Sequence, residues 1–293
     1  MKTLLWIALA LLTALLAWLA YTGNGRDALP AVGTAEPGYY RQEPAGTAHG
    51  TVVLLASLGR PVSDFNALAQ SLVAAGWRTL AVESRGMGTW AGAGFFGPAT
   101  LAGYADDVAS ALTHSRLPAH ARVVVVGHAY GNRVARAFAV QHPARTAGVV
   151  LLAAGDKPHL PPEIEQGLKR AALSPLPWAL REDAVRRTFF APGHAVSADW
   201  QRGWSAWAAL AQSRAVRATP TALIRDAGHA PVLVVQPAAD VVAPVSQGTQ
   251  LVAELGPRAR LVVIPEAGHA LLPEQPGAVA QAVLGFLRTL PQP

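Results

Sequence analysis

Residues 123–131 have the sequence Val-Val-Val-Val-Gly-His-Ala-Tyr-Gly, and this stretch decides the fold. Four β-branched residues in a row predict a buried strand. Two glycines around Ala129 then predict a tight turn. An amphipathic helix follows at once, with Val134 and Phe138 on its apolar stripe. A buried strand that turns sharply into a helix is typical of an α/β protein with a parallel sheet.

The turn matches the Gly-x-Ser-x-Gly pattern of a nucleophile elbow except at its central position. The flanking glycines are needed there because a Cβ on either side would clash with the strand or the helix. Ala129 stands where the pattern requires a nucleophilic hydroxyl or thiol. A methyl group cannot attack a carbonyl carbon. The alanine is compatible with an engineered substitution, a natural loss, or chemistry without a covalent step.

Strands and helices alternate on both sides of this stretch, which predicts a mostly parallel sheet of about eight strands with helices on both faces. The expected strands are 51–56, 78–83, 122–127, 148–153, 232–236 and 260–264, and the expected helices are 64–75, 101–114 and 277–290. Prolines break the periodicity between 157 and 228, so we expect short helices that form a lid there. We expect one large α/β domain over 51–293, preceded at 22–50 by a linker and the first strands.

The chain begins with an uncharged segment. After Lys2, residues 3–20 carry no charge and are rich in Leu, Ala and Trp. This length suits one membrane-spanning helix, and Trp18 fits poorly at the −3 position of a cleavage site after Ala20. We therefore expect residues 1–21 to be an inner-membrane anchor, with a cleaved signal segment as the alternative. Either one places the domain on the outer, periplasmic side of the membrane.

The composition excludes several kinds of site. The chain has no cysteine, which excludes disulfides, thiolate catalysis and cysteine-based zinc sites. Its formal net charge is +6, but it has no block of Lys and Arg of the kind that binds nucleic acid. We expect no metal, no cofactor and no nucleic-acid partner, and we expect a small-molecule substrate. The sequence does not indicate an oligomeric state.

Two polar residues in the second half of the chain each follow a predicted strand. These residues are Asp240 and His269. Because the carboxyl ends of parallel strands meet at one edge of the sheet, we expect both residues to converge there with Ala129. An acid in this position would hold a histidine in one tautomer and stabilise its charged form, which leaves the other ring nitrogen to take a proton. Asp156, which also follows a predicted strand, is an alternative acid.

The order of elbow, acid and histidine resembles that of the α/β-hydrolase fold family in its single-domain, lid-bearing form. The resemblance covers roughly residues 50–290. It implies that Asp240 is the acid, that His269 is the general base, and that Ala129 occupies the nucleophile position. It also implies hydrolysis of an ester, an amide or a related bond.

The resemblance extends to the loop after the first long strand. Leu58-Gly59 corresponds to the family's His-Gly loop, with Leu58 where histidine is common. In the family, the N–H group of the residue after that glycine and the N–H group of the residue after the nucleophile form the oxyanion hole. The resemblance therefore implies an oxyanion hole formed by Arg60 and Tyr130.

Three classes of function fit these residues. The first is a hydrolase for a small ester-like or carbonyl substrate, in which the Asp240–His269 dyad activates water and a backbone oxyanion hole stabilises the charge. The second is base-catalysed, lyase-type chemistry, which needs a base and an oxyanion hole but no nucleophile. The third is a catalytically inactive, membrane-tethered binding or scaffold protein. The retained Asp240 and His269 favour an enzyme, because the fold requires neither residue.

Overall fold

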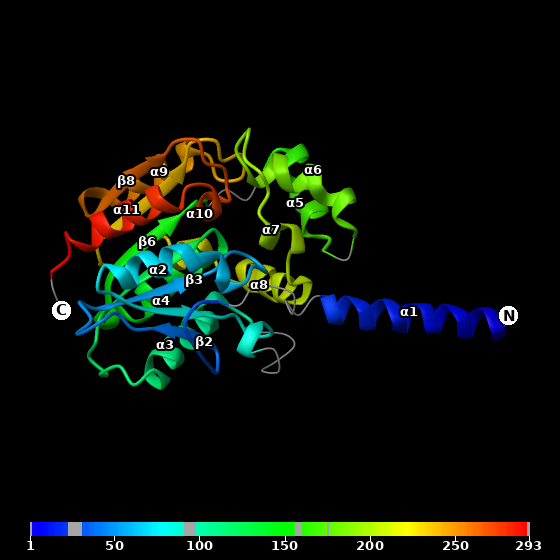
Figure 1. Ribbon diagram of the computed structural model, residues 1–293, viewed down its shortest axis with the longest axis horizontal. Coiled ribbons are helices and arrows are strands. Elements are labelled where there is room, and N and C mark those ends of the chain that lie inside the picture. Colours follow the sequence, from blue (N-terminus) through cyan, green and yellow to red (C-terminus); the bar gives the residue numbers. More distant parts are fainter. Residues whose placement is uncertain (1, 23–30, 91–97, 156–159, 175, 292–293) are drawn as a thin grey trace.

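The computed structural model describes residues 2–22, 31–90, 98–155, 160–174 and 176–291 (Figure 1). An eight-stranded sheet forms the centre of the domain, in the order β1-β2-β4-β3-β5-β6-β7-β8. Strands β3 to β8 run parallel, whereas β1 and β2 pair antiparallel at one edge. The prediction of a mostly parallel sheet of about eight strands is confirmed.

The strands lie close to the ranges expected from the sequence. The central ones are mostly apolar because helices cover both faces of the sheet. The strands are β1 (Thr34–Glu36), β2 (Tyr39–Gln42), β3 (Thr51–Leu55), β4 (Arg78–Val82), β5 (Val123–His128), β6 (Thr146–Leu152), β7 (Val232–Pro237) and β8 (Ala259–Ile264).

Successive side chains along each strand point to opposite faces of the sheet, and each face has its own hydrophobic core. Val123 and Val125 of β5 pack into the core under α3 (Leu101–His114), α4 (Tyr130–Gln141) and α9 (Val245–Leu255). Val124 and Val126 pack into the opposite core under α2 (Asn66–Ala74) and α11 (Pro276–Leu287). The remaining short helices of the domain are η1 (Val62–Phe65), η2 (Gly88–Trp90), η3 (Pro143–Arg145), η5 (Gly256–Arg258) and α10 (Leu271–Glu274).

The region between β6 and β7 is helical, as expected. Its described part contains α5 (Pro162–Ala172), α6 (Trp178–Phe189), α7 (Ala198–Arg202), α8 (Ala206–Ala218) and η4 (Thr221–Leu223). Pro161 and Pro177 stand immediately before α5 and α6, where a proline starts a helix without costing a hydrogen bond. These helices pack around Trp200 and Trp204 in a small core that also includes Ala270. We call α5 to α8 with their connecting segments the lid.

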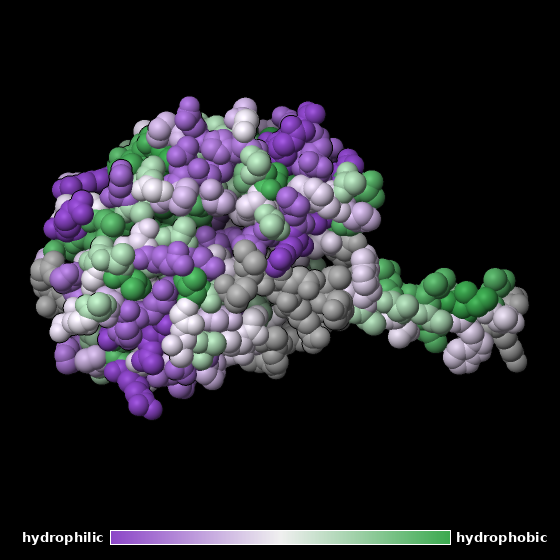
Figure 2. Space-filling model, viewed as in Figure 1, coloured by the Kyte–Doolittle hydropathy of each residue, from purple (hydrophilic) through white to green (hydrophobic). Residues whose placement is uncertain are grey.

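The N-terminal helix α1 (Lys2–Thr22) projects from the domain, and its described side chains are exposed (Figures 1 and 2). Among the residues that the structure describes, no helix is long and apolar enough to cross a membrane. The predicted membrane anchor in residues 1–21 is therefore not supported.

Candidate active site

Ala129 lies on the sharp turn between β5 and α4. Its backbone has φ 49° and ψ −105°, outside the regions that residues other than glycine favour. A Cβ added to Gly127 would overlap the backbone of Gly131, and a Cβ added to Gly131 would overlap the carbonyl oxygen of Leu55. The turn therefore requires both glycines, and it holds Ala129 in the strained backbone geometry that a nucleophile elbow needs.

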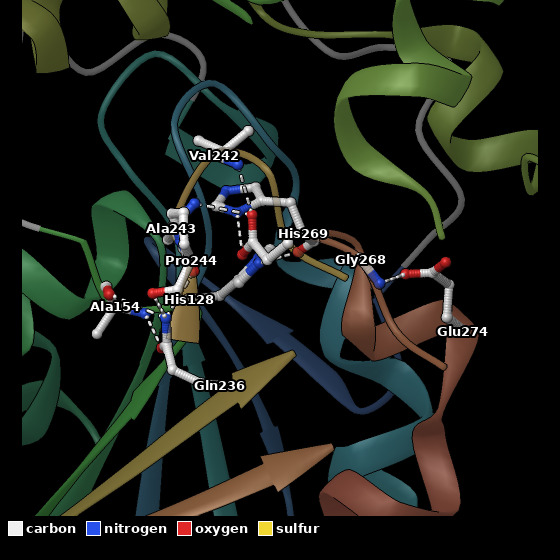
Figure 3. A network of polar contacts seen from close by, with 10 residues as sticks. His128, Ala154, Gln236, Val242, Ala243, Pro244, Gly268, His269 and Glu274 are labelled. Carbon is white, nitrogen blue, oxygen red and sulfur yellow. Dashed lines mark hydrogen bonds and ion pairs between the residues drawn. The ribbon is translucent and has the colours of Figure 1, made fainter. Parts of the chain in front are cut away.

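Asp240 and His269 lie beyond the carboxyl ends of β7 and β8, respectively. His269 and the residues around it are shown in Figure 3. The distance between His269 Nδ1 and Asp240 Oδ2 is 2.8 Å, and both residues are buried. The other oxygen of Asp240 accepts hydrogen bonds from the N–H groups of Val242 and Ala243, both at 2.8 Å. The carboxylate is thus fixed on two sides, and it leaves His269 Nε2 as the nitrogen that can exchange a proton.

Gln236 supports the loop that carries the acid. It lies at the end of β7, fully buried, and its Nε2 donates a hydrogen bond to the carbonyl oxygen of Ala243 at 2.7 Å. Its Oε1 accepts from the N–H group of Ala154 at 2.7 Å (Figure 3). Gln236 therefore ties the Asp240 loop to the loop that follows β6.

His128, the last residue of β5, fixes the backbone of His269. Its Nε2 donates to the carbonyl oxygen of His269 at 2.8 Å, and the centroids of the two rings lie 5.3 Å apart. Burial, with a smaller contribution from His269, lowers the pKa of His128 to about 3. His128 is therefore neutral at physiological pH, and its hydrogen bond to His269 does not require a charge.

The loop after β3 differs from the prediction. The N–H group of Arg60 donates to the carbonyl oxygen of Ser57 at 3.0 Å and closes a turn, so it is already engaged. Leu58 lines the same cavity as Tyr130, and the N–H group of Leu58 has no acceptor among the described residues. Tyr130 opens α4, where N–H groups have no partner within the helix. Leu58 and Tyr130 thus line the cavity with backbone N–H groups that have no acceptor among the described residues, whereas the N–H group of Arg60 is engaged in the turn.

The side chain of Arg60 has a different place, beneath the lid. Its guanidinium forms two hydrogen bonds with the carboxylate of Asp64, at 2.9 and 2.6 Å, and donates to the carbonyl oxygen of Gly203 at 2.6 Å. It also stacks on the ring of Trp200, with 4.3 Å between its Cζ and the ring centroid. Burial raises the pKa of the Asp64 carboxyl, and Arg60 opposes that effect. Arg60 therefore connects the loop after β3 to the lid.

Gln212 of α8 holds the same loop from the lid side. The N–H group of Gly59 donates to Gln212 Oε1 at 2.7 Å, and Gln212 Nε2 donates to Ser84 Oγ at 2.8 Å. The carbonyl oxygen of Gly59 accepts from the N–H group of Ser205 at 2.8 Å. Gly59 has φ 62°, and a Cβ added to it would lie 2.9 Å from the carbonyl oxygen of Ser205. The geometry of the loop therefore depends on the lid.

A cavity of about 500 Å³ opens between the elbow and the lid. Ala129, Tyr130 and His269 lie in its wall. The rest of the described lining is mostly apolar and includes Leu58, Leu160, Leu168, Phe189, Trp204 and Val216, while Ser57, Arg133, Ser213, Arg217 and Gln247 contribute polar groups. The described residues contain no group of His, Asp and Glu side chains that could hold a metal ion. The cavity suits an apolar group held beside the elbow and the histidine.

Three residues that support the site were missed at the level of the sequence. Gln236 carries a signal, because it is the one amide in an otherwise apolar strand. Glu274, which contacts the His269 loop, carries only its position five residues after that histidine. Gln212 lies in an alanine-rich helix and carries no local signal. Asp156, the alternative acid, lies outside the described residues.

Comparison with known proteins gives one family and many similar folds. Residues 46–276 match the family model described as serine aminopeptidase, S33. A sequence relative from Variovorax paradoxus, "Putative carbamate hydrolase RutD", is 37% identical over 121 residues. That match covers 39% of this chain and 42% of the relative, so the chain matches less than half of the relative's length.

Solved structures agree with the fold. An esterase from Thermogutta terrifontis has a TM-score of 0.67 at 24% identity, over 89% of this chain and 98% of that one. An esterase from Exiguobacterium antarcticum has a TM-score of 0.69 at 15% identity, over 88% and 100%. A hydrolase from Pseudomonas aeruginosa has a TM-score of 0.65 at 25% identity, over 85% and 93%. At these identities the likeness concerns the architecture.

Proposed function

Because the chain belongs to the serine aminopeptidase S33 family of α/β-hydrolases, we propose that it is a hydrolase in which His269 activates a water molecule directly. The observation that carries this proposal is the Asp240–His269 pair, which lies near an elbow that bears Ala129. One oxygen of Asp240 is hydrogen-bonded to His269, and the other accepts from two backbone N–H groups. The acid and the base are retained in hydrogen-bonded form, and only the attacking atom is absent. Replacement of a serine CH₂OH group by a methyl group leaves room for an oxygen beside His269.

The proposed reaction has two steps. His269 Nε2 takes a proton from water while the water oxygen attacks the carbonyl carbon of the substrate, and the carbonyl oxygen becomes an oxyanion. The N–H groups of Leu58 and Tyr130 donate to that oxyanion. The tetrahedral intermediate then collapses, the bond to the leaving oxygen breaks, and that oxygen receives the proton from His269. Asp240 stabilises the imidazolium between the two steps.

The proposed substrate is a small ester or carbamate with an apolar group. The mostly apolar cavity of about 500 Å³ supports this choice. The esterases among the similar structures and the carbamate hydrolase named for the Variovorax relative support an ester or carbamate bond. Serine enzymes that lose their nucleophile commonly still accelerate the reaction by about 10³–10⁴-fold over the uncatalysed rate in water. A site that activates water directly can start from this residual activity.

The test is a screen of p-nitrophenyl esters and carbamates with acyl groups of increasing length. We expect slow turnover without a burst phase, and we expect His269→Ala to abolish it because the base is lost. The presence of Ala129 also favours a second candidate, a binding protein without turnover. In that case no ester is hydrolysed, and His269→Ala keeps the affinity for a non-hydrolysable ester analogue within about fivefold, since the residue contributes little to ground-state binding.

The location of the domain is a separate proposal. The uncharged residues 3–20 after Lys2 support export of the domain to the outer side of the membrane. A C-terminal fusion to a reporter enzyme that is active only outside the cytoplasm tests it.

A further inference from the structure

One carboxylate joins the loop that carries His269 to the lid. Oε2 of Glu274 accepts a hydrogen bond from the N–H group of Gly268 at 2.8 Å (Figure 3). Oε1 of the same side chain accepts from the N–H group of Ala191 at 2.6 Å. Gly268 immediately precedes His269, and Ala191 follows the end of α6 in the lid. The side chain of Glu274 therefore bridges the two segments through one oxygen each.

The other neighbour of His269 is held by the same part of the lid. The N–H group of Ala270 donates to the carbonyl oxygen of Phe189 at 2.7 Å. The ring of Phe189 lies 5.8 Å from the ring of His269, between centroids. Residues on both sides of the histidine are thus bonded to the lid segment 189–191, one directly and one through Glu274.

The two segments approach so closely that only glycine fits at position 268. A Cβ added to Gly268 would lie 2.6 Å from the carbonyl oxygen of Phe189 and 2.7 Å from the backbone nitrogen of Ala191. Such distances are shorter than real Cβ contacts, so any larger residue would push the lid away from the His269 loop. The contact between the His269 loop and the lid is therefore a close backbone contact, and it does not depend on exposed side chains.

We propose that Glu274 is a positioning residue that fixes the backbone of His269 by bonding its loop to the lid. The inference rests on the proposed function, because it assigns a role at the same base. On this proposal, the lid holds the backbone of His269 in place as well as covering the cavity. His269 is then held at three points, namely its ring by Asp240, its carbonyl oxygen by His128, and its preceding residue by Glu274.

A carboxylate is suited to this place because both of its oxygens accept hydrogen bonds. An amide has one accepting oxygen and one NH₂ group, which only donates. Glu274→Gln keeps the shape of the side chain but must leave the N–H group of either Gly268 or Ala191 without its acceptor. Glu266→Gln is the matched control, because Glu266 lies in the same loop and its exposed carboxylate makes no hydrogen bond among the described residues.

Amide hydrogen exchange on the full chain tests the contact without any need for turnover. We expect Glu274→Gln to speed exchange at Gly268 or Ala191 by about tenfold, the factor that corresponds to one lost hydrogen bond. Exchange at Val125 in the sheet should stay as in the wild type, which shows that the fold is intact. The NMR signals of the His269 ring should shift in Glu274→Gln and stay unchanged in Glu266→Gln.

Kinetics then separate positioning from stability. On an ester that the wild type hydrolyses, Glu274→Gln should lower kcat by about tenfold and change KM by less than about twofold. If the wild type hydrolyses nothing, the proposed function fails, and the exchange rates and the His269 ring signals still decide the role of Glu274. Unchanged exchange at both Gly268 and Ala191, or an unchanged His269 ring, would overturn the inference. An unchanged kcat in an active enzyme would overturn it as well.

Discussion

Asp240 and His269 form a buried pair in which a carboxylate oxygen lies 2.8 Å from the ring Nδ1. The second oxygen of Asp240 is occupied by two backbone N–H groups, so the carboxylate cannot rotate away without losing three hydrogen bonds. An arrangement of this kind orients an imidazole for proton transfer at Nε2. Ala129, the elbow residue that lines the same cavity, has no hydroxyl or thiol from which His269 could take a proton.

The acid is tested by Asp240→Asn. The amide preserves the shape of the side chain but presents an NH₂ group either to His269 or to the backbone N–H groups, which favours the wrong tautomer. We expect the rate of ester hydrolysis to fall by about 10²–10⁴ with little change in the fold, as measured by circular dichroism and initial rates. An unchanged rate would move the role of the acid to another residue, with Asp156 as the candidate.

The pH dependence of stability reports on His128. Native His128 takes up its proton only near pH 3, whereas the unfolded chain takes it up near 6.5. The unfolded state therefore binds more protons between these two values, and the stability due to neutral His128 is lost as the pH falls through this range. The slope is at most about 1.4 kcal/mol per pH unit.

His128→Gln isolates this contribution, because every other titrating group is common to both proteins. The difference in the free energy of unfolding between wild type and variant should shrink as the pH falls from 6.5 towards 3. Urea unfolding at several pH values measures it. A difference that stays constant over this range would show that His128 titrates normally in the native state.

The ion pair of Arg60 and Asp64 lies beneath the lid, and Arg60 also donates a hydrogen bond to the carbonyl oxygen of Gly203 in the lid. Both side chains are almost completely buried, so removal of one partner leaves an uncompensated charge. We expect Asp64→Leu to lower the free energy of unfolding by about 3–5 kcal/mol. The exposed pair of Asp183 and Arg187 provides the control, and Asp183→Leu should have a much smaller effect. Equal losses in the two variants would contradict the buried role of Arg60.

Gln212 predicts a functional link between the lid and the oxyanion loop. Gln212→Leu removes the acceptor of the Gly59 N–H group, and we expect this to misplace the adjacent Leu58 and lower kcat by about tenfold. Gln212→Glu keeps that acceptor, and the hydroxyl group of Ser84 can turn to donate to the second carboxylate oxygen, so this variant should retain more activity than Gln212→Leu. Initial rates for the two variants decide the matter. If Gln212→Leu keeps full activity, the loop holds its shape without the lid.

Much of the fold and the core of the site could be predicted from local sequence. Apolar strands followed by polar loops located Asp240 and His269, because a parallel sheet brings all strand ends to one edge. The two glycines around Ala129 revealed the elbow, because the strand and the helix approach too closely for any other residue. These features depend on residues that are near one another in the chain.

The parts that local sequence could not supply depend on contacts between distant residues. Arg60 was assigned to the oxyanion hole by its place in the loop, but the turn that it closes with Ser57 uses its N–H group. The buried environment of its guanidinium comes from the lid, more than a hundred residues further along the chain. Gln212 and Glu274 likewise gain their roles only through tertiary contacts.

The most direct test of the central claim restores the missing nucleophile. In Ala129→Ser, the new hydroxyl stands on the strained elbow, and Leu58, Tyr130 and His269 line the same cavity. We predict that a fluorophosphonate probe labels this variant at the introduced hydroxyl and that p-nitrophenyl esters give a burst, whereas the wild type shows neither. A folded Ala129→Ser protein that stays unlabelled and shows no burst would contradict the claim that the hydrolytic site is complete except for its attacking atom.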